Sequence, residues 1–280
     1  MCWWMVLNIN LKGYVKILFL LVIIFKKNEM NKEGEAVTQN RLGFEKLNIA
    51  LGVLYKEWYE LISHQLSESD GMNLELGCGA SFMDKIIKNV KKSDVFINSN
   101  TDLKIDAMEV GLKFENKISN LILVNVFHHI SNPQLFLRSA EKSLLKGGRI
   151  IMVEPSNNIW SRLVYKLVGH EKFDTEQITW EFESNDPLLD SNQALSWMIF
   201  KRDYKKFKKL FPKFSILSKK SMMPLSYLLS GGHTHNTKVG KIFITIIRKL
   251  ERMFFDNQFG IFDLICICLL YTSDAADDTC

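Results

Sequence analysis

The chain has 280 residues, of which 47% are hydrophobic and 24% charged, with a formal net charge of +5. This balance is typical of a globular protein, and the length suffices for one large α/β domain with a well-buried core. The five cysteines form no CxxC pair and show no zinc-binding spacing, so a reduced, cytoplasmic setting fits.

The first 29 residues form a hydrophobic extension. Residues 14–25 are apolar except for Lys16, but this stretch is shorter than the roughly 20 residues that cross a bilayer. No small-residue cleavage site follows, which argues against a signal peptide. The segment is an over-extended gene start before a native Met30, a membrane anchor or an ordinary helix, and the sequence leaves these three open.

A helical pattern follows Glu35, and strands then alternate with helices. Leu51, Leu54 and Trp58 fall three or four residues apart on one apolar face. We expect strands at 73–77, 94–98, 103–106, 121–126 and 148–153, and helices at 81–90 and 133–145. Such alternation predicts a parallel, doubly wound sheet, in which ligands bind beyond the carboxyl ends of the strands.

A glycine loop closes the first of these strands. Gly77 and Gly79 allow a sharp turn and the close approach of a ligand. A dinucleotide fold would need a third glycine where this chain has Phe82, so NAD and FAD are disfavoured. A strand-turn-helix corner without a ligand is the alternative.

Four motifs follow one another along the chain: the loop 74–81, the step 105–107, the run 121–129 that ends in two histidines, and residues 145–155. Together they resemble the class I S-adenosylmethionine (SAM)-dependent methyltransferases, most closely the type-11 group. The resemblance implies a Rossmann-like, seven-stranded sheet with an antiparallel terminal strand. It covers a domain at 30–267, in which residues 156–200 form a helical and aromatic cap.

The resemblance also implies which residues hold SAM. Glu75 would fix the methionine end, and Asp106 would accept a hydrogen bond from the adenine amino group. The positions assigned to the cofactor are Glu75, Gly77, Cys78, Gly79, Asn100, Asp106, Ala107, Asn125 and Val126.

Three residues depart from the family pattern. Asn100 stands where an acidic residue usually accepts the ribose hydroxyls, Ser81 replaces a glycine, and Asn120 replaces an Asp. An amide loses the charge-assisted hydrogen bonds that a carboxylate makes there. These departures leave open a non-catalytic, SAM-fold binding or accessory protein.

The histidines are the candidates for catalysis. His170 would accept a proton from the acceptor, with Glu171 or Glu154 beside it, although a capping or salt-bridging pair is an equal alternative. His128 would lie at the border between cofactor and substrate. Because neighbouring residues on a strand point to opposite faces, we expect the side chains of His128 and His129 to diverge, and we expect no metal site.

We therefore expect a SAM-dependent methyltransferase acting on a small molecule, with O-methylation of a glycan, lipid or secondary metabolite as the first hypothesis. Residues 201–220 are rich in Lys and Arg, which predicts a solvated helix face or a peripheral membrane contact. Nothing resembles a nucleic-acid-binding module. Residues 268–280 resemble translated sequencing-adapter DNA, and we expect an artefactual tail there. The sequence identifies neither the acceptor nor the oligomeric state.

Overall fold

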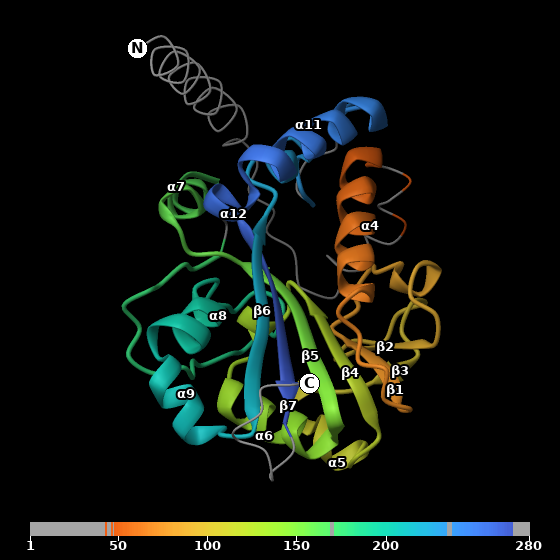
Figure 1. Cartoon of the computed structure of the whole chain (residues 1–280), viewed down its shortest axis with the longest axis vertical. Coiled ribbons are helices and arrows are strands. Elements are labelled where there is room, and N and C mark those ends of the chain that lie inside the picture. Colours follow the sequence, from red (N-terminus) through yellow and green to blue (C-terminus); the bar gives the residue numbers. More distant parts are fainter. Residues whose placement is uncertain (1–42, 44–45, 47, 169–170, 234–236, 271–280) are drawn as a thin grey trace.

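The computed structural model describes residues 43, 46, 48–168, 171–233 and 237–270. A seven-stranded sheet with the order β3-β2-β1-β4-β5-β7-β6 forms the centre of the molecule (Figure 1). The strands are β1 (Met72–Leu76), β2 (Val90–Asp94), β3 (Leu103–Lys104), β4 (Ile118–Val124), β5 (Leu144–Pro155), β6 (Phe214–Met222) and β7 (Phe262–Leu269). The helices are α4 (Ile49–Ser63), α5 (Val110–Lys113), α6 (Pro133–Ser143), α7 (Ile159–Val168), α8 (Leu195–Trp197), α9 (Tyr204–Leu210), α10 (Ser226–Ser230), α11 (Lys241–Phe254) and α12 (Asp256–Phe259).

The topology confirms the expected fold class. The first five strands pair in parallel, whereas β7 lies between β5 and β6 and runs antiparallel to both. The central strands are buried on both faces, which explains their continuous runs of apolar residues. Parallel strands share one carboxyl edge, so the segments that follow β1, β2, β4 and β5 meet there.

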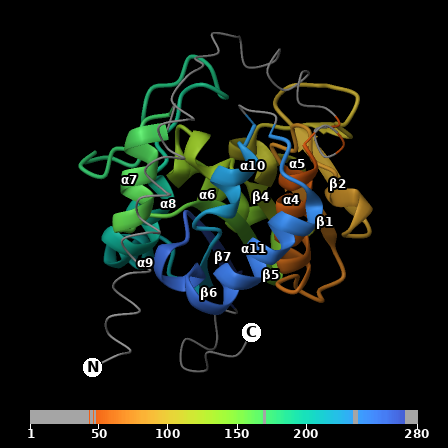
Figure 2. The same ribbon diagram turned by 90° about the horizontal axis from the view of Figure 1, so that it is seen from above.

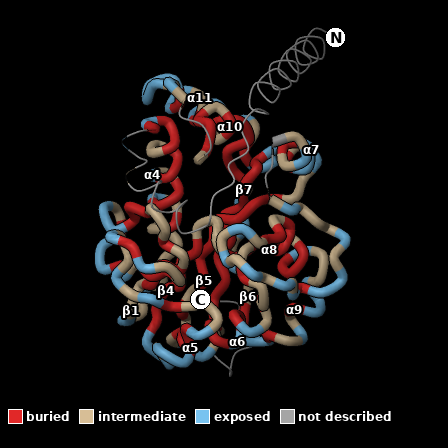
Figure 3. The backbone as a smooth tube through the Cα atoms, turned by 180° about the vertical axis from the view of Figure 1, so that it is seen from behind, coloured by how far each residue is buried: buried red, intermediate tan, exposed pale blue. Residues whose placement is uncertain are grey.

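Side-chain alternation along these strands produces two hydrophobic cores. Leu121 and Leu123 of β4 pack into one cluster, and Ile122 between them packs into the other. The second cluster includes Trp58, because α4 lies on that face beside α10 and α11 (Figure 2). Buried backbone follows the sheet and the inner side of α4, whereas much of α11 is exposed (Figure 3).

The second strand begins and ends four residues earlier than the sequence pattern suggested. The expectation of a strand at 94–98 was wrong, because β2 spans Val90–Asp94 and the apolar run after it is irregular, with Ile97 64% exposed. The helix expected at 81–90 is also missing, and only Met83–Lys85 form a 3₁₀ turn there. Asn89 adopts a positive φ of 59°, which no α-helix accommodates.

The cap region contributes more to the core than the sequence indicated. Trp180 is fully buried in the first cluster, and its indole nitrogen donates a hydrogen bond to Asp203. Trp160 donates to the backbone oxygen of Pro224. These aromatic residues therefore pack the protein interior, and the structure gives no reason to assign them to an acceptor.

The end of the sheet corrects one expected boundary. Cys268 and Leu269 belong to β7 and pair with Ser215 and Phe214, so the sheet includes the first two residues of the expected artefactual tail. Residues 271–280 and the hydrophobic extension 1–29 lie outside the described residues. Within the described part of the chain, no helix combines the length and apolar character that crossing a membrane requires.

Candidate active site

The glycine loop after β1 packs closely against the residue that follows β4. Gly77 has φ 65° and Gly79 has φ 47°, conformations that favour glycine. A Cβ atom at Gly77 would lie 2.6 Å from Cγ2 of Val126. Two of the segments expected to hold the cofactor are therefore in contact at the carboxyl edge of the sheet.

Glu75 is the buried acidic residue at the base of this loop. Only 2% of its surface is exposed, and no described residue donates a hydrogen bond to its Oε2. Burial raises the pKa of the carboxyl group to about 8, although a hydrogen bond from Ser81 opposes this effect. At neutral pH Glu75 is thus mainly protonated, and a cation bound beside it would favour its ionised form.

Asp94 ends β2 and points back to the glycine loop, a role that the sequence reading missed. Its Oδ2 accepts a hydrogen bond from the backbone nitrogen of Gly79 at 2.8 Å, and its Oδ1 accepts one from Phe96. Burial raises the pKa of this carboxyl group above its ordinary value. Asp94 is the first residue of the expected strand 94–98 but the last residue of β2, so the shift of the strand moves its carboxylate to the carboxyl edge.

Asn100, which was expected at the end of the second strand, instead forms hydrogen bonds with the backbone of the glycine loop. Its Nδ2 donates to the backbone oxygens of Gly79 (3.1 Å) and Ser81 (2.7 Å), and its Oδ1 accepts from Nζ of Lys92 at 2.6 Å. Cys78 lies in the same loop, where burial raises the pKa of its thiol to about 12 and leaves it unreactive at neutral pH.

Asp106 and Ala107 lie at the far side of the same edge, directly after β3. Asp106 caps the 3₁₀ turn Ala107–Glu109, since its carboxylate accepts a hydrogen bond from Met108 N at 2.8 Å. The capping contact uses Oδ1, and the residue is half-buried. The step expected to meet the adenine is therefore an ordered turn.

Asn125 and Val126 follow β4, and their backbone nitrogens both have partners. Asn125 has φ 55° and donates to the backbone oxygen of Val153 at 2.8 Å. Val126 donates to Oε1 of Glu154 at 2.9 Å. The side-chain oxygen of Asn125 is buried, and no described group donates a hydrogen bond to it. This oxygen is therefore a second free acceptor at the edge.

Glu154, near the end of β5, organises the turn that carries the paired histidines. Its carboxylate is fully buried and accepts hydrogen bonds from the backbone nitrogens of Val126, Phe127 and His128. Its Oε2 also lies 2.6 Å from Nδ1 of His128. One side chain thus fixes both the backbone of the turn and the orientation of an imidazole ring.

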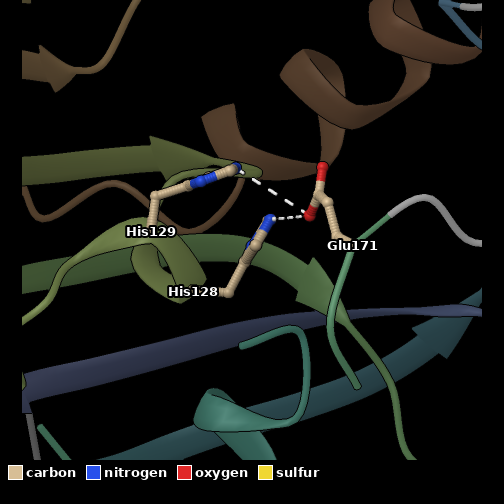
Figure 4. A group of neighbouring side chains, drawn as sticks. All are labelled: His128, His129 and Glu171. Carbon is tan, nitrogen blue, oxygen red and sulfur yellow. Dashed lines mark hydrogen bonds and ion pairs between the residues drawn. The ribbon is translucent and has the colours of Figure 1, made fainter. Parts of the chain in front are cut away.

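The two histidines lie side by side and face Glu171 (Figure 4). Their ring centroids are 4.3 Å apart, so the expectation that the side chains diverge was wrong. The physical reason is that Phe127–His129 form a 3₁₀ turn after β4, where strand alternation no longer applies. From Oε2 of Glu171, Nε2 of His128 is 3.1 Å away and Nε2 of His129 is 4.0 Å away.

The pKa values of His128, His129 and Glu171 are shifted in different directions. Burial lowers the pKa of His128, but the charge and hydrogen bond of Glu154, together with Glu171, outweigh it and raise the pKa to about 10. Burial and the charge of His128 lower the pKa of His129 to about 4. Burial raises the pKa of Glu171, but the hydrogen bond and charge of His128 lower it to about 2. With nothing else bound, a cationic His128 therefore lies between two carboxylates.

His170, which was expected to accept a proton, lies outside the described residues. Its neighbour Glu171 is described, and it also accepts hydrogen bonds from Ser191 (3.3 Å) and Gln193 (3.2 Å). The structure thus brings Glu154, His128 and Glu171 together. The contribution of His129 was missed, because it depends on a turn that the strand pattern did not predict.

No model of a known protein family matches the chain, and no curated protein matches it. Among solved structures, a SAM-dependent methyltransferase from Archaeoglobus fulgidus is similar, with 14% identity, a TM-score of 0.47 and coverage of 80% of this chain and 97% of that one. A possible histamine N-methyltransferase from Thermotoga maritima has 13% identity and a TM-score of 0.48, covering 81% and 94%. A geranyl diphosphate C-methyltransferase from Streptomyces coelicolor has 10% identity and a TM-score of 0.47, covering 81% and 84%. At these identities the similarities do not identify an activity.

The topology of the chain itself supports the assignment of the fold. The sheet has seven strands, and β7 is inserted antiparallel between β5 and β6, as the motif resemblance implies. The glycine loop lies at the end of β1, and the paired histidines follow β4. The chain has a Rossmann-like fold, in which a seven-stranded sheet carries an antiparallel strand near one edge.

Proposed function

We propose that the chain is a SAM-dependent methyltransferase that acts on an oxygen of a small-molecule acceptor, such as a glycan, lipid or secondary metabolite. The observation that carries the proposal is Glu75, a buried carboxyl group at the base of the glycine loop whose Oε2 has no hydrogen-bond partner among the described residues. A group of this kind is costly to keep unless it meets a positively charged ligand. The α-ammonium group of SAM is such a cation.

The residues at the carboxyl edge fit SAM as a ligand. Glu75 would hold the methionine end, and the free oxygen of Asn125 would accept a further hydrogen bond nearby. Asp94 supplies the acidic residue at the end of the second strand that Asn100 was thought to replace. Asp106 would face the adenine. With a carboxylate in place, the structure gives less support to the alternative of an accessory protein.

When bound, SAM supplies a methyl group that its sulfonium already activates. The protein then has to bind the acceptor, orient it and exclude water. His128 is held by Glu154 and Glu171, and its raised pKa leaves it without a free lone pair at neutral pH. His128 therefore suits orientation of the acceptor better than removal of its proton. His170 remains the predicted proton acceptor.

Proton release on SAM binding tests the proposal directly. A cation beside Glu75 should ionise it, so calorimetric titration at pH 7 in two buffers of different ionisation enthalpy should reveal release of about one proton. The Glu75→Gln variant should bind more weakly and release none. The S-adenosylhomocysteine product carries the same ammonium group and should give the same result. Absence of SAM binding to the folded wild-type protein would refute the proposal.

Turnover separates an enzyme from a binding protein. Methyl transfer from labelled SAM to a panel of hydroxyl-bearing acceptors should be detectable and should require Glu75. SAM binding without transfer to oxygen, nitrogen or carbon acceptors would favour the accessory protein. Transfer to nitrogen or carbon alone would keep the enzyme and correct the acceptor.

A further inference from the structure

We propose that His128, His129 and Glu171 form a binding site for a divalent transition-metal ion. Their ligand atoms, two imidazole nitrogens and a carboxylate oxygen, all lie within 4.8 Å of one another. Two histidines and one carboxylate are a ligand set that Zn²⁺ and Fe²⁺ use in catalytic sites with an open position.

The distances suit an ion at the centre of the three groups. A metal ion about 2.0–2.1 Å from each ligand holds the ligand atoms about 3.3–3.5 Å apart. The separations from Oε2 of Glu171 are 3.1 Å to Nε2 of His128 and 4.0 Å to Nε2 of His129. Side-chain rotations that move these atoms by a few tenths of an ångström would bring both separations to about 3.3–3.5 Å. Both rings already face this carboxylate (Figure 4).

The hydrogen bonds behind the rings leave the correct nitrogens for coordination. Nδ1 of His128 lies 2.6 Å from Oε2 of Glu154, and Nδ1 of His129 lies 3.2 Å from the backbone oxygen of Asp190. A carboxylate or carbonyl oxygen accepts, so each Nδ1 carries a proton, and each ring in its neutral form has its lone pair on Nε2. Outer partners of this kind orient metal-binding histidines and increase their basicity.

The burial of the group also suits a site with an open coordination position. His128 is buried and the side chain of His129 is 14% exposed, whereas that of Glu171 is 33% exposed. An ion can therefore reach the group from the Glu171 side and retain a water molecule there. Ser191 and Gln193 hold the Glu171 carboxylate in place.

Binding of the ion is a balanced exchange for a proton. Each metal–nitrogen bond would form on the lone pair of Nε2, and any proton held on that nitrogen would be released to solvent. If the proposed methyltransferase function holds, a hydroxyl of the acceptor would occupy the open position. Coordination lowers the pKa of a bound hydroxyl, so proton removal would not depend on a histidine base.

Titration of the metal-stripped protein with Zn²⁺ and Co²⁺ tests the site without any assay of activity. We expect one equivalent of Zn²⁺ to bind with a dissociation constant on the order of 1 µM or tighter. Co²⁺ in a four- or five-coordinate site should give an intense visible spectrum. His129→Gln and Glu171→Gln should each weaken binding by about 100-fold. Glu154→Gln, which alters the support of His128 and of the turn that carries it, should weaken binding by about 10- to 100-fold.

Matched controls are the exposed residues His64 and Glu183. His64→Gln and Glu183→Gln should bind Zn²⁺ as the wild type does. Circular dichroism checks the fold of each variant. Should His129→Gln fail to fold, Glu171→Gln still tests the site, because Glu171 is partly exposed.

Two results would overturn the metal site: no binding of Zn²⁺ to the wild type at about 100 µM, or equal binding by wild type, His129→Gln and Glu171→Gln. SAM titration in the presence of a chelator distinguishes this failure from failure of the proposed function. If SAM binds neither the chelator-treated nor the Co²⁺-loaded protein, while the separate Co²⁺ titration gives the expected spectrum, the methyltransferase is refuted and the metal site stands. The reverse pattern refutes only the metal site.

Discussion

Oε2 of Glu154 and Nδ1 of His128 lie 2.6 Å apart, and both side chains are buried. Because Glu154 also accepts three backbone hydrogen bonds, this contact joins the end of β5 to the turn after β4. A single buried carboxylate therefore determines the shape of the edge at which the candidate site lies.

Replacing Glu154 should lower the stability of the folded protein. Glu154→Ala leaves three backbone nitrogens and an imidazole without their acceptor, and we expect it to lower the free energy of unfolding by about 3–5 kcal/mol. Glu154→Gln keeps an acceptor oxygen and should cost less. Urea denaturation measures both. Equal stability of the Ala variant and the wild type would contradict the role assigned to Glu154.

Glu75 should make stability depend on pH. The pKa of its carboxyl group is about 8 in the folded protein, whereas an exposed Glu has its ordinary value of 4.5. The folded state therefore holds the proton more tightly, so this contribution is complete below the ordinary pKa and is lost as the pH rises through about 8. The loss should be on the order of a few kcal/mol. Denaturation at a series of pH values should show the decline in the wild type and a flatter curve in Glu75→Gln.

Alanine substitutions at two glycines with similar backbone angles allow the cost of backbone strain to be measured apart from the cost of steric contact. Gly77 and Gly147 have φ 65° and 72°, but a Cβ at Gly77 would meet Val126, whereas one at Gly147 would meet nothing within 4 Å. Gly147→Ala should cost about 1 kcal/mol, the cost of a left-handed backbone. Gly77→Ala should cost more and should weaken SAM binding.

Addition of Val126→Ala to Gly77→Ala tests the origin of this difference. The second substitution removes the methyl groups that the new Cβ would meet, so part of the extra cost should disappear relative to the sum of the single variants. Thermal denaturation supplies the comparison. Strict additivity would show that contact with Val126 is not the cause.

Asp94 and Asp102 offer a test of which carboxylate serves the cofactor. Asp94 contacts the glycine loop through Gly79, whereas Asp102 accepts from the backbone of Lys92. Asp94→Asn should weaken SAM binding about tenfold, corresponding to the loss of one charge-assisted hydrogen bond. Asp102→Asn should leave the affinity nearly unchanged. The opposite ranking, measured by calorimetry, would move the ribose site to Asp102.

Arg248 should be among the most important residues for stability outside the site. Its buried guanidinium forms ion pairs with Glu57, Glu251 and Asp256, and these partners raise its pKa despite burial. Arg248→Met would leave three carboxylates without their shared cation and should cost about 3–5 kcal/mol. Arg252→Met, at a side chain that is 49% exposed and 3.8 Å from Glu57, should cost less than about 1 kcal/mol.

Much of the fold could be predicted because local patterns and tertiary structure agree. The buried central strands contain continuous apolar runs, and the glycine loop is where the motif places it. The prediction was wrong for β2, whose Lys91 and Lys92 carry little apolar signal. That strand depends on pairing with β1, and long-range pairing is not visible in a local window.

The candidate site was only partly predictable for the same reason. Residue types identified Glu75, His128 and Glu154, which end or follow strands. The sequence could not show that Glu154 would hold the turn after β4, since Glu154 lies 26 to 28 positions from the residues whose backbone nitrogens it binds. Once that turn forms, His129 swings beside His128 and towards Glu171. A shared edge of the sheet creates this group.

The position of β7 has a consequence for the order of events during synthesis. This strand, Phe262–Leu269, is the last described strand in the chain, yet it lies between β5 and β6. On the ribosome, β6 emerges before β7, which is the strand that pairs with it. Strand β6 therefore has no neighbour in the sheet until β7 has also been synthesised. The edge of β5 stays open for even longer. The nascent chain therefore exposes the unpaired edges of β5 and β6 until β7 closes the sheet.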